Sequence, residues 1–301
     1  MTSAVQLRSV DRTFGAATAL DNVSFSVPEN SITGLLGRNG AGKTTIMSLI
    51  SGQDRPTSGD VSVFGHNPFE HAPTLTRISY VRDNQRYPDN YLLHHVLRIA
   101  PEFAPNWSSE LAAELVEGFR LPAKTQIRKM SRGQLSAVAI VLGLASRAPL
   151  TLLDEPYLGL DVSARSFFYD VLLRDYTRHP RTVLLSTHLV EESEQLFDRI
   201  VIVDRGKITA DCSRDDAAGL ASVVSGTGER VRSICHGRDV LAEHAVGGLL
   251  SLTVSGTFDD ADRGAAQGLG IQVAPASLQQ LVAAQGNDLP DKSSLKAGAY
   301  S

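Results

Sequence analysis

A glycine-rich stretch at residues 37–44 carries the residue types that hold a chain of phosphates. It reads Gly-Arg-Asn-Gly-Ala-Gly-Lys-Thr, which matches the pattern of glycine, four residues, glycine, lysine and serine or threonine. The glycines let backbone N–H groups wrap a phosphate, and a helix that begins at Lys43 would point its positive end at the same anion. Lys43 could reach the β- and γ-phosphates, and Thr44 could ligate Mg²⁺. The predicted nucleotide-binding residues are Gly37, Arg38, Asn39, Gly40, Ala41, Gly42, Lys43, Thr44 and Thr45.

A second chemical feature is a pair of acids at the end of an apolar run. Residues 150–155 read Leu-Thr-Leu-Leu-Asp-Glu, a buried strand that ends in Asp154 and Glu155. Taken alone, such a pair is an ordinary strand terminus. Beside a phosphate loop, Asp154 would complete the Mg²⁺ shell, and Glu155 would face the γ-phosphate, where a carboxylate can accept a proton from an attacking water. The two features together predict nucleotide hydrolysis.

The elements that must position these residues alternate between strands and helices. Apolar strands alternate with helical segments, which predicts an α/β fold with a mostly parallel core sheet. Between about residues 89 and 147, apolar residues recur at helical intervals, which predicts an inserted helical subdomain. The expected strands are 5–10, 23–27, 31–36, 150–154, 182–186 and 200–204, and the expected helix after the glycine loop is 43–50.

A change of composition near residue 217 predicts a second, small unit. Alanine, glycine and serine dominate there, and the periodicity weakens. Residues 249–254 and 271–273 have strand character, and 277–282 read as a short helix, so we expect a compact α+β appendage with a frayed tail from residue 286. The expected division is a nucleotide-binding domain at 1–216 and an accessory domain at 217–301.

Composition narrows the class of protein. With 42% hydrophobic and 21% charged residues, the 301-residue chain is globular, and its net charge of −4 argues against nucleic acid or an anionic membrane as a partner. The first residues lack a signal-peptide pattern, and the apolar run at 135–146 is shorter than the ~20 residues that span a bilayer. Cys212 and Cys235 lack zinc-ligand spacing and read as reduced cysteines. We expect a cytoplasmic protein that reaches a membrane only through a partner.

Further motifs surround the two chemical sites. Residues 130–134 read Met-Ser-Arg-Gly-Gln, and residues 154–161 read Asp-Glu-Pro-Tyr-Leu-Gly-Leu-Asp. Residues 186–188 read Ser-Thr-His after an apolar strand, Phe14-Gly15 precedes the second strand, and residues 204–208 read Asp-Arg-Gly-Lys-Ile. In this order, over about residues 5–210, the chain resembles the nucleotide-binding subunits of ABC transporters. Residues 130–134 are similar to the signature Leu-Ser-Gly-Gly-Gln of that family.

The resemblance implies a RecA-like P-loop NTPase core, with ATP and Mg²⁺ as ligands. It assigns Phe14 to stacking on adenine and Asp161 to the acid of the D-loop. His188 would contact the γ-phosphate and position the attacking water beside Glu155. The expected activity is ATP hydrolysis that drives transport.

The resemblance also implies a second ATP-binding subunit, identical or different. Subunits of this family pair head to tail, so that Ser131, Gly133 and Gln134 of one cap the ATP held by the other. Ser131 as the N-cap of a helix, with free N–H groups at Gly133 and Gln134, would form a second anion site. Arg132 replaces a signature glycine, and its guanidinium could add charge near the phosphate or point to solvent.

One departure from the family concerns the third Mg²⁺ contact, beside Thr44 and Asp154. Members carry a glutamine after the strand equivalent to residues 78–81, where it touches Mg²⁺ and moves with the membrane partner. Counting from that strand, Asp83 falls at the position and Gln85 lies just beyond it, and we favour Asp83. An acid there would add negative charge next to the triphosphate.

The implied membrane partner is a separate integral permease, which would place the chain peripherally on the inner face of the membrane. The helical region and the small second unit resemble bacterial export-type ATPases more than sugar importers. Two alternatives remain open: a soluble ABC ATPase that remodels a ribosome or nucleoprotein, and a nucleotide switch that hydrolyses ATP weakly.

Overall fold

The computed structural model describes residues 2–82, 85–88 and 90–284, and it divides the chain into two compact units. The first unit comprises Met1–His188 and Gln195–Asp211, and the second comprises Leu189–Glu194 and Cys212–Ser301. The composition predicts a division at residue 217, but contacts between residues distant in the sequence place it at Cys212 and assign the segment after His188 to the second unit. The predicted frayed tail from residue 286 lies outside the described residues.

The main sheet of the first unit has six strands in the order β5-β6-β7-β3-β8-β9. The pairs from β5 to β8 are parallel, and every residue of β3, β6 and β7 is buried, which explains their uninterrupted apolar runs. Asp154 pairs with Ser186 across β6 and β7, so the carboxyl ends of neighbouring strands align. The strands are β3 (Ile32–Leu36), β5 (Ile78–Arg82), β6 (Leu150–Asp154), β7 (Thr182–Thr187), β8 (Arg199–Asp204) and β9 (Lys207–Ser213).

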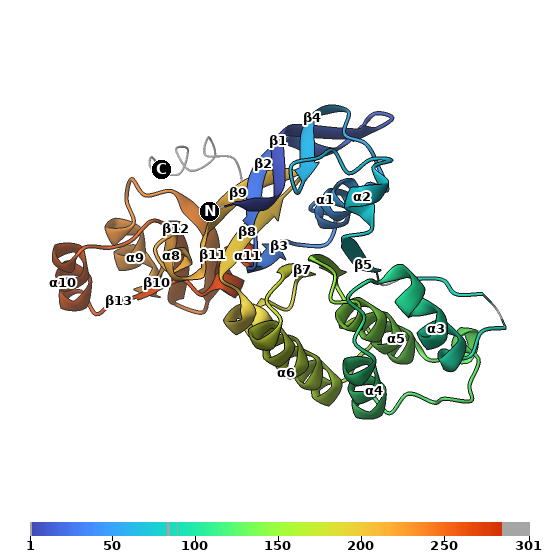
Figure 1. Cartoon of the computed structure of the whole chain (residues 1–301). Coiled ribbons are helices and arrows are strands. Elements are labelled where there is room, and N and C mark those ends of the chain that lie inside the picture. The colour runs from blue at the N-terminus through green and yellow to red at the C-terminus, as the bar shows by residue number, and fades with distance from the viewer. Residues whose placement is uncertain (1, 83–84, 89, 285–301) are drawn as a thin grey trace. The chain divides into compact units, whose positions relative to one another are not determined.

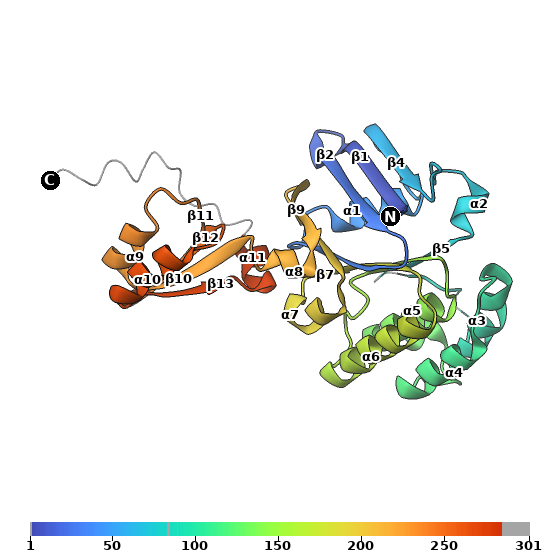
Figure 2. The same ribbon diagram turned by 60° about the vertical axis from the view of Figure 1, so that its left-hand side comes forward.

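A separate antiparallel sheet holds β1 (Ser3–Phe14), β2 (Ala17–Pro28) and β4 (Ser58–Val63) in the order β2-β1-β4. The sequence predicts two of these strands but not that they leave the main sheet. Helix α1 (Lys43–Ile50), predicted with the same bounds, buries Ile46 and Ile50 in a core to which both sheets contribute. Figure 1 and Figure 2 show this sheet and α1 on one side of the main sheet.

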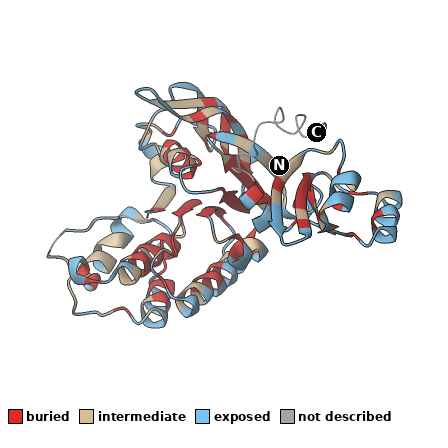
Figure 3. Cartoon of the chain, turned by 180° about the vertical axis from the view of Figure 1, so that it is seen from behind, coloured by how far each residue is buried: buried red, intermediate tan, exposed pale blue. Residues whose placement is uncertain are grey.

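The helices between residues 89 and 178 gather on the other side of the main sheet (Figure 1). Helix α5 (Arg132–Ala145) packs on α4 (Ser109–Gly118) and β5 and is buried over most of its length, as Figure 3 shows. The inserted helical subdomain is thereby confirmed. The helices of this unit after α1 are α2 (Ala72–Leu75), α3 (Leu93–Ile99), α4 (Ser109–Gly118), α5 (Arg132–Ala145) and α6 (Val162–Arg178), with 3₁₀ helices η1 (Ala100–Phe103) and η2 (Ile127–Lys129). No helix among the residues described is both long and apolar enough to traverse a membrane.

The second unit is an α+β fold, as predicted, but it has more elements than the sequence indicates. Its four antiparallel strands have the order β11-β12-β10-β13, and the chain order β-α-β-β-α-β is the ferredoxin-like arrangement. One apolar cluster, which includes Val224, Val231, Leu252 and Phe258, forms its core. The elements are β10 (Ala221–Thr227), α9 (Gly228–Ile234), β11 (Val240–Val246), β12 (Leu249–Ser255), α10 (Asp260–Gly268), β13 (Gln272–Pro275) and α11 (Leu278–Ala284), preceded by α8 (Arg214–Ala217).

A short segment from the middle of the chain completes the second unit. Helix α7 (Val190–Ser193) begins two residues after His188 and packs against α11, and η3 (Glu194–Leu196) then returns the chain to the first unit. Val190 and Ser193 are buried. The second unit is therefore not a simple C-terminal addition, because the chain enters it twice.

A buried aspartate in α6 joins two arginines of the first unit. Asp175 is 4% exposed, and its carboxylate oxygens lie 2.7 Å from a guanidinium nitrogen of Arg147 and 2.7 Å from one of Arg181. Arg181 is itself 4% exposed, and burial lowers the pKa of its guanidinium, which the charge of Asp175 opposes. Asp175 therefore compensates two positive charges that precede β6 and β7.

We predict that Asp175→Ala lowers the free energy of unfolding of the first unit by about 3–5 kcal/mol, because it leaves the buried guanidinium of Arg181 and the half-buried one of Arg147 without their carboxylate. Urea unfolding followed by circular dichroism would measure the loss. Asp170→Ala, at an exposed position of the same helix, is the matched control and should change stability by no more than about 0.5 kcal/mol. Equal losses in the two variants would contradict the prediction.

Candidate functional site

The glycine loop joins β3 to α1 and turns sharply at Gly42. Gly42 has φ +112°, and a Cβ there would lie 2.8 Å from Leu20 Cδ2, so only glycine fits this position. Lys43 is 6% exposed, and its ammonium donates to the carbonyl oxygens of Gly37 at 2.7 Å and Arg38 at 3.2 Å. The ammonium group is thus held inside the loop by two backbone carbonyls.

A cavity of about 480 Å³ opens above this loop. Six predicted loop residues line it, together with Glu155. Sequence reasoning missed four other lining residues. Thr18 and Ala19 belong to β2, and Arg205 and Gly206 form the turn between β8 and β9. The motif at residues 204–208 is the signal that could have indicated the second pair. The predicted loop residues that line the cavity are Asn39, Gly40, Gly42, Lys43, Thr44 and Thr45.

The first acid of the pair lies against the loop. Asp154 is 6% exposed; its Oδ2 accepts a hydrogen bond from Thr44 Oγ1 at 2.8 Å, and its Oδ1 accepts one from Ser186 Oγ at 2.6 Å. The Tyr80 hydroxyl lies 3.5 Å from Oδ2, and burial, then the charge of Asp154, raises the pKa of Tyr80. A carboxylate and a hydroxyl in contact are the oxygen donors that Mg²⁺ prefers, so Thr44 and Asp154 fit that ion.

The second acid meets both the loop and the predicted histidine. Glu155 Oε1 lies 3.4 Å from Lys43 Nζ, and Glu155 Oε2 lies 2.7 Å from His188 Nδ1. The backbone of Glu155 has φ +48°, a left-handed conformation that few residues other than glycine adopt without strain. Lys43, at the start of α1, and His188, directly after β7, therefore converge on the carboxylate of Glu155.

The signature segment forms the beginning of α5. Ser131 is the N-cap; its hydroxyl accepts from Gln134 N at 3.2 Å, while Gln134 Oε1 accepts from Ser131 N at 2.9 Å. A Cβ on Gly133 would lie 2.3 Å from the carbonyl oxygen of Gly159, so the helix start touches the backbone of the loop after Glu155. Ser136 Oγ also donates to Leu158 O at 2.6 Å. This close approach within one subunit explains why residue 133 is a glycine.

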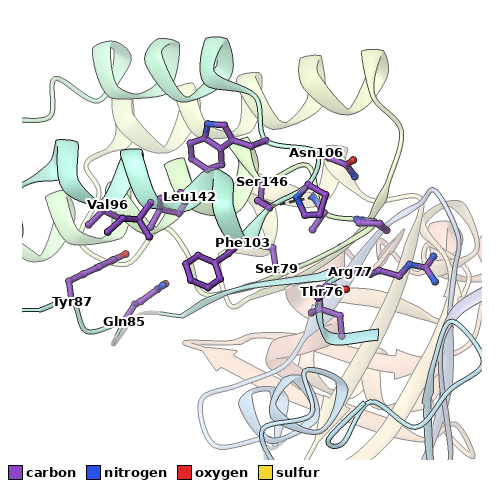
Figure 4. A pocket seen from close by; sticks show the side chains of 18 of the residues that line it. Thr76, Arg77, Ser79, Gln85, Tyr87, Val96, Phe103, Asn106, Leu142 and Ser146 are labelled. Carbon is purple, nitrogen blue, oxygen red and sulfur yellow. Dashed lines mark hydrogen bonds between the residues drawn. The ribbon is translucent and has the colours of Figure 1, made fainter. Parts of the chain in front are cut away.

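Several predicted residues lie apart from the cavity above the glycine loop. The described residues that line it do not include Phe14, Asp161 or Gln85. Phe14 is 51% exposed beneath the guanidinium of Arg12, and Asp161 caps α6 by accepting from Ala164 N at 2.8 Å. Gln85 lines a different cavity (Figure 4).

Ser131, Gly133 and Gln134 are likewise absent from that lining. Asp83, the preferred third Mg²⁺ contact, lies outside the described residues.

Comparison with known proteins gives this site its context. A family model described as ABC transporter matches residues 20–158. The Nod factor export ATP-binding protein I of Cupriavidus metallidurans is 30% identical over 217 residues, which cover 70% of this chain and 71% of that protein. The chain belongs to the ABC transporter family.

Other members of the family differ in the direction of transport that their names give. The aliphatic sulfonates import ATP-binding protein SsuB 1 of Burkholderia lata is 33% identical, over 69% of this chain and 63% of that protein. This chain therefore spans less than two thirds of that relative's length. The doxorubicin resistance ATP-binding protein DrrA of Mycobacterium tuberculosis is 33% identical over 218 residues.

A solved structure described as an ATP-binding subunit of an ABC transporter superposes with a TM-score of 0.64 at 26% identity. It covers 71% of this chain and 92% of that one. The P-loop NTPase fold of the family is confirmed in the first unit.

We predict that Gly133→Ala lowers the free energy of unfolding of the first unit by about 1–3 kcal/mol, because the added methyl group meets the backbone at Gly159. Urea unfolding would measure the loss. The control is Gly264→Ala in α10, where a Cβ has nothing within 4 Å and helix propensity favours alanine by about 1 kcal/mol. A Gly133→Ala protein as stable as the wild type would refute the close approach.

Proposed function

We propose that the chain is an ATP-hydrolysing subunit that powers an ABC transporter. The observation that supports this most strongly is the convergence of Lys43, Glu155 and His188 beside the paired Thr44 and Asp154. These residues come from the start of α1 and from the carboxyl ends of β6 and β7, and they meet at the edge of a parallel sheet where open α/β sheets bind ligands.

Each of these groups has a role in hydrolysis that its position supports. The Lys43 ammonium would bind the β- and γ-phosphates of ATP. These phosphates would compete with the Glu155 carboxylate for the ammonium group. Glu155 would accept the proton of the attacking water, and His188 would orient the γ-phosphate and that water. Thr44 and Asp154 would hold Mg²⁺, which when bound neutralises phosphate charge. Mg²⁺ and ATP are thus the proposed ligands.

The proposed partner in hydrolysis is a second ATP-binding subunit, of the same or a different chain. Ser131, Gly133 and Gln134 form a helix start that is exposed or half-buried, and they would cap the ATP held by the other subunit. Phe14 would stack on adenine, and Asp161 would act at the interface between the subunits. One subunit alone would then hold two incomplete halves of a site.

The proposed membrane partner is a permease that contacts a second cavity of about 480 Å³. Figure 4 shows Gln85, Tyr87, Phe103 and Leu142 around it, between β5 and the helical region. Phe103 is 78% exposed, which suits an apolar segment of another protein. Strand β5 pairs with β6 so that Arg82 lies opposite Asp154, and this would link the permease contact to the ATP site. The chain would then lie in the cytoplasm, on the inner face of the membrane.

We propose export as the direction of transport because the second unit is small. Relatives named for import and for export are both similar to the chain, so the proposal does not rest on them. The alternatives are a soluble ABC ATPase and a weakly hydrolysing nucleotide switch, and the experiments below separate them.

We predict that Glu155→Gln abolishes ATP turnover, with a loss of about 100-fold or more, while ATP still binds, because the amide cannot accept the proton of water. Phosphate release and binding of a fluorescent ATP analogue would measure the two effects. Glu117→Gln, an exposed change in α4, should leave turnover unchanged. Equal and slow turnover in wild type and Glu155→Gln would favour the nucleotide switch.

We predict that Phe103→Asp reduces recovery of the tagged chain with integral membrane proteins from detergent extracts, because the charge opposes burial of that surface. Quantitative mass spectrometry of the co-purified proteins would measure this. Leu173→Asp, at a 45% exposed position of α6 outside the cavity lining, is the matched control. Recovery of the wild type with ribosomes and no membrane protein would refute the permease partner.

A further inference from the structure

Tyr157 places a buried hydroxyl between the two residues proposed to act on water. It follows Glu155 and Pro156 in the turn after β6, and its side chain is 2% exposed. Its hydroxyl contacts Glu155 Oε2, lies 2.7 Å from Thr187 Oγ1 and 3.4 Å from His188 Nδ1, and is 3.0 Å from the backbone nitrogen of His188. One hydroxyl group thus touches the ends of both β6 and β7.

The hydrogen atoms at this hydroxyl can be assigned from its chemistry. A tyrosine hydroxyl has one proton to donate and two lone pairs that accept. The backbone N–H of His188 can only donate, so it donates to one lone pair of the hydroxyl oxygen. The Glu155 carboxylate can only accept, so it accepts the hydrogen bond that the tyrosine hydroxyl donates. Thr187 Oγ1 then donates to the second lone pair. This assignment leaves every group around the Tyr157 hydroxyl with a partner.

The same carboxylate oxygen of Glu155 accepts from the histidine. His188 Nδ1 lies 2.7 Å from Glu155 Oε2, so Nδ1 carries a proton and directs Nε2 away from Glu155. Glu155 Oε2, the Tyr157 hydroxyl and His188 therefore form a closed group, in which Tyr157 holds the backbone of His188 and His188 holds the side chain of Glu155.

We propose that the Tyr157 hydroxyl is a positioning group for ATP hydrolysis, which fixes Glu155 and His188 relative to each other without touching the nucleotide. This rests on the proposed ATPase function. Tyr157 is only 2% exposed, whereas the His188 side chain is 37% exposed, so the tyrosine hydroxyl acts through its two neighbours.

Two further observations support a positioning role. Burial, and then the charge of Glu155, raises the pKa of Tyr157, so the hydroxyl stays protonated at physiological pH and donates rather than acts as a base. Glu155 has a left-handed backbone at φ +48°, a conformation that persists only where neighbouring contacts hold it. The hydroxyl supplies such a contact at the side chain, and Ser186 supplies another at the Glu155 N–H.

The test begins with Tyr157→Phe in the full chain, which keeps the ring and removes the hydroxyl. We expect kcat for ATP hydrolysis to fall about 10- to 100-fold, because Glu155 and His188 lose their common anchor. KM for ATP and the affinity for a fluorescent ATP analogue should stay within about 2-fold, since the phosphate loop is untouched. The matched control is Tyr169→Phe in α6, another tyrosine with little exposure, which should keep the wild-type kcat.

A double-variant cycle separates positioning from a general structural effect. If Tyr157 and His188 act as one unit, Tyr157→Phe combined with His188→Ala should lose clearly less kcat than the product of the two single losses. Losses that multiply would overturn the proposal, and so would a Tyr157→Phe chain that hydrolyses ATP at the wild-type rate or no longer binds ATP.

The Glu155→Gln variant distinguishes failure of the proposed ATPase function from failure of the proposed role of Tyr157. If Glu155→Gln turns over ATP as the wild type does, the proposed function fails. If Glu155→Gln is inactive and Tyr157→Phe matches the wild type, only the role of Tyr157 fails.

Discussion

The first unit is organised around one buried carboxylate, Asp154. A charge that is 6% exposed must be compensated by hydrogen bonds, and here they come from three different elements: Thr44 of α1, Ser186 of β7 and, at longer distance, Tyr80 of β5. The parallel register of β5, β6 and β7 is what brings these donors to one point. The same carboxylate is a proposed Mg²⁺ ligand, so the stability of the sheet edge and the proposed chemistry depend on the same contacts.

The side chains proposed to bind ATP already have internal partners. Lys43 is held by two loop carbonyls and lies near Glu155, and the Ser131 hydroxyl caps its own helix. Phosphate oxygens would have to replace some of these contacts, and a charged acceptor is stronger than a carbonyl. Binding would therefore exchange one set of hydrogen bonds for another, and Glu155 Oε1, released from Lys43, would be free to face water.

The sequence predicts the main sheet and the residues at its carboxyl edge because short buried strands and glycine turns leave strong local patterns. Lys43, Thr44, Asp154 and Glu155 could be found in this way, the resemblance to the family added His188, and the five residues meet. The second unit left a weak pattern, since its strands bury one face and use alanine and serine. Tyr157 left no signal at all, because its importance depends on which residues β7 brings beside it. Phe14 and Asp161 lie apart, and their proposed roles need a ligand or a partner.

The path of the chain after His188 bears on how this protein could be divided. The segment Leu189–Glu194 packs within the second unit and then leads back to β8 of the first. Truncation at residue 211 would leave the buried face of α7 without the α11 surface that covers it, directly next to the histidine that contacts Glu155. The nucleotide-binding unit is consequently not a cassette that can be excised by one cut, and a boundary drawn from sequence similarity alone would pass through a folded core.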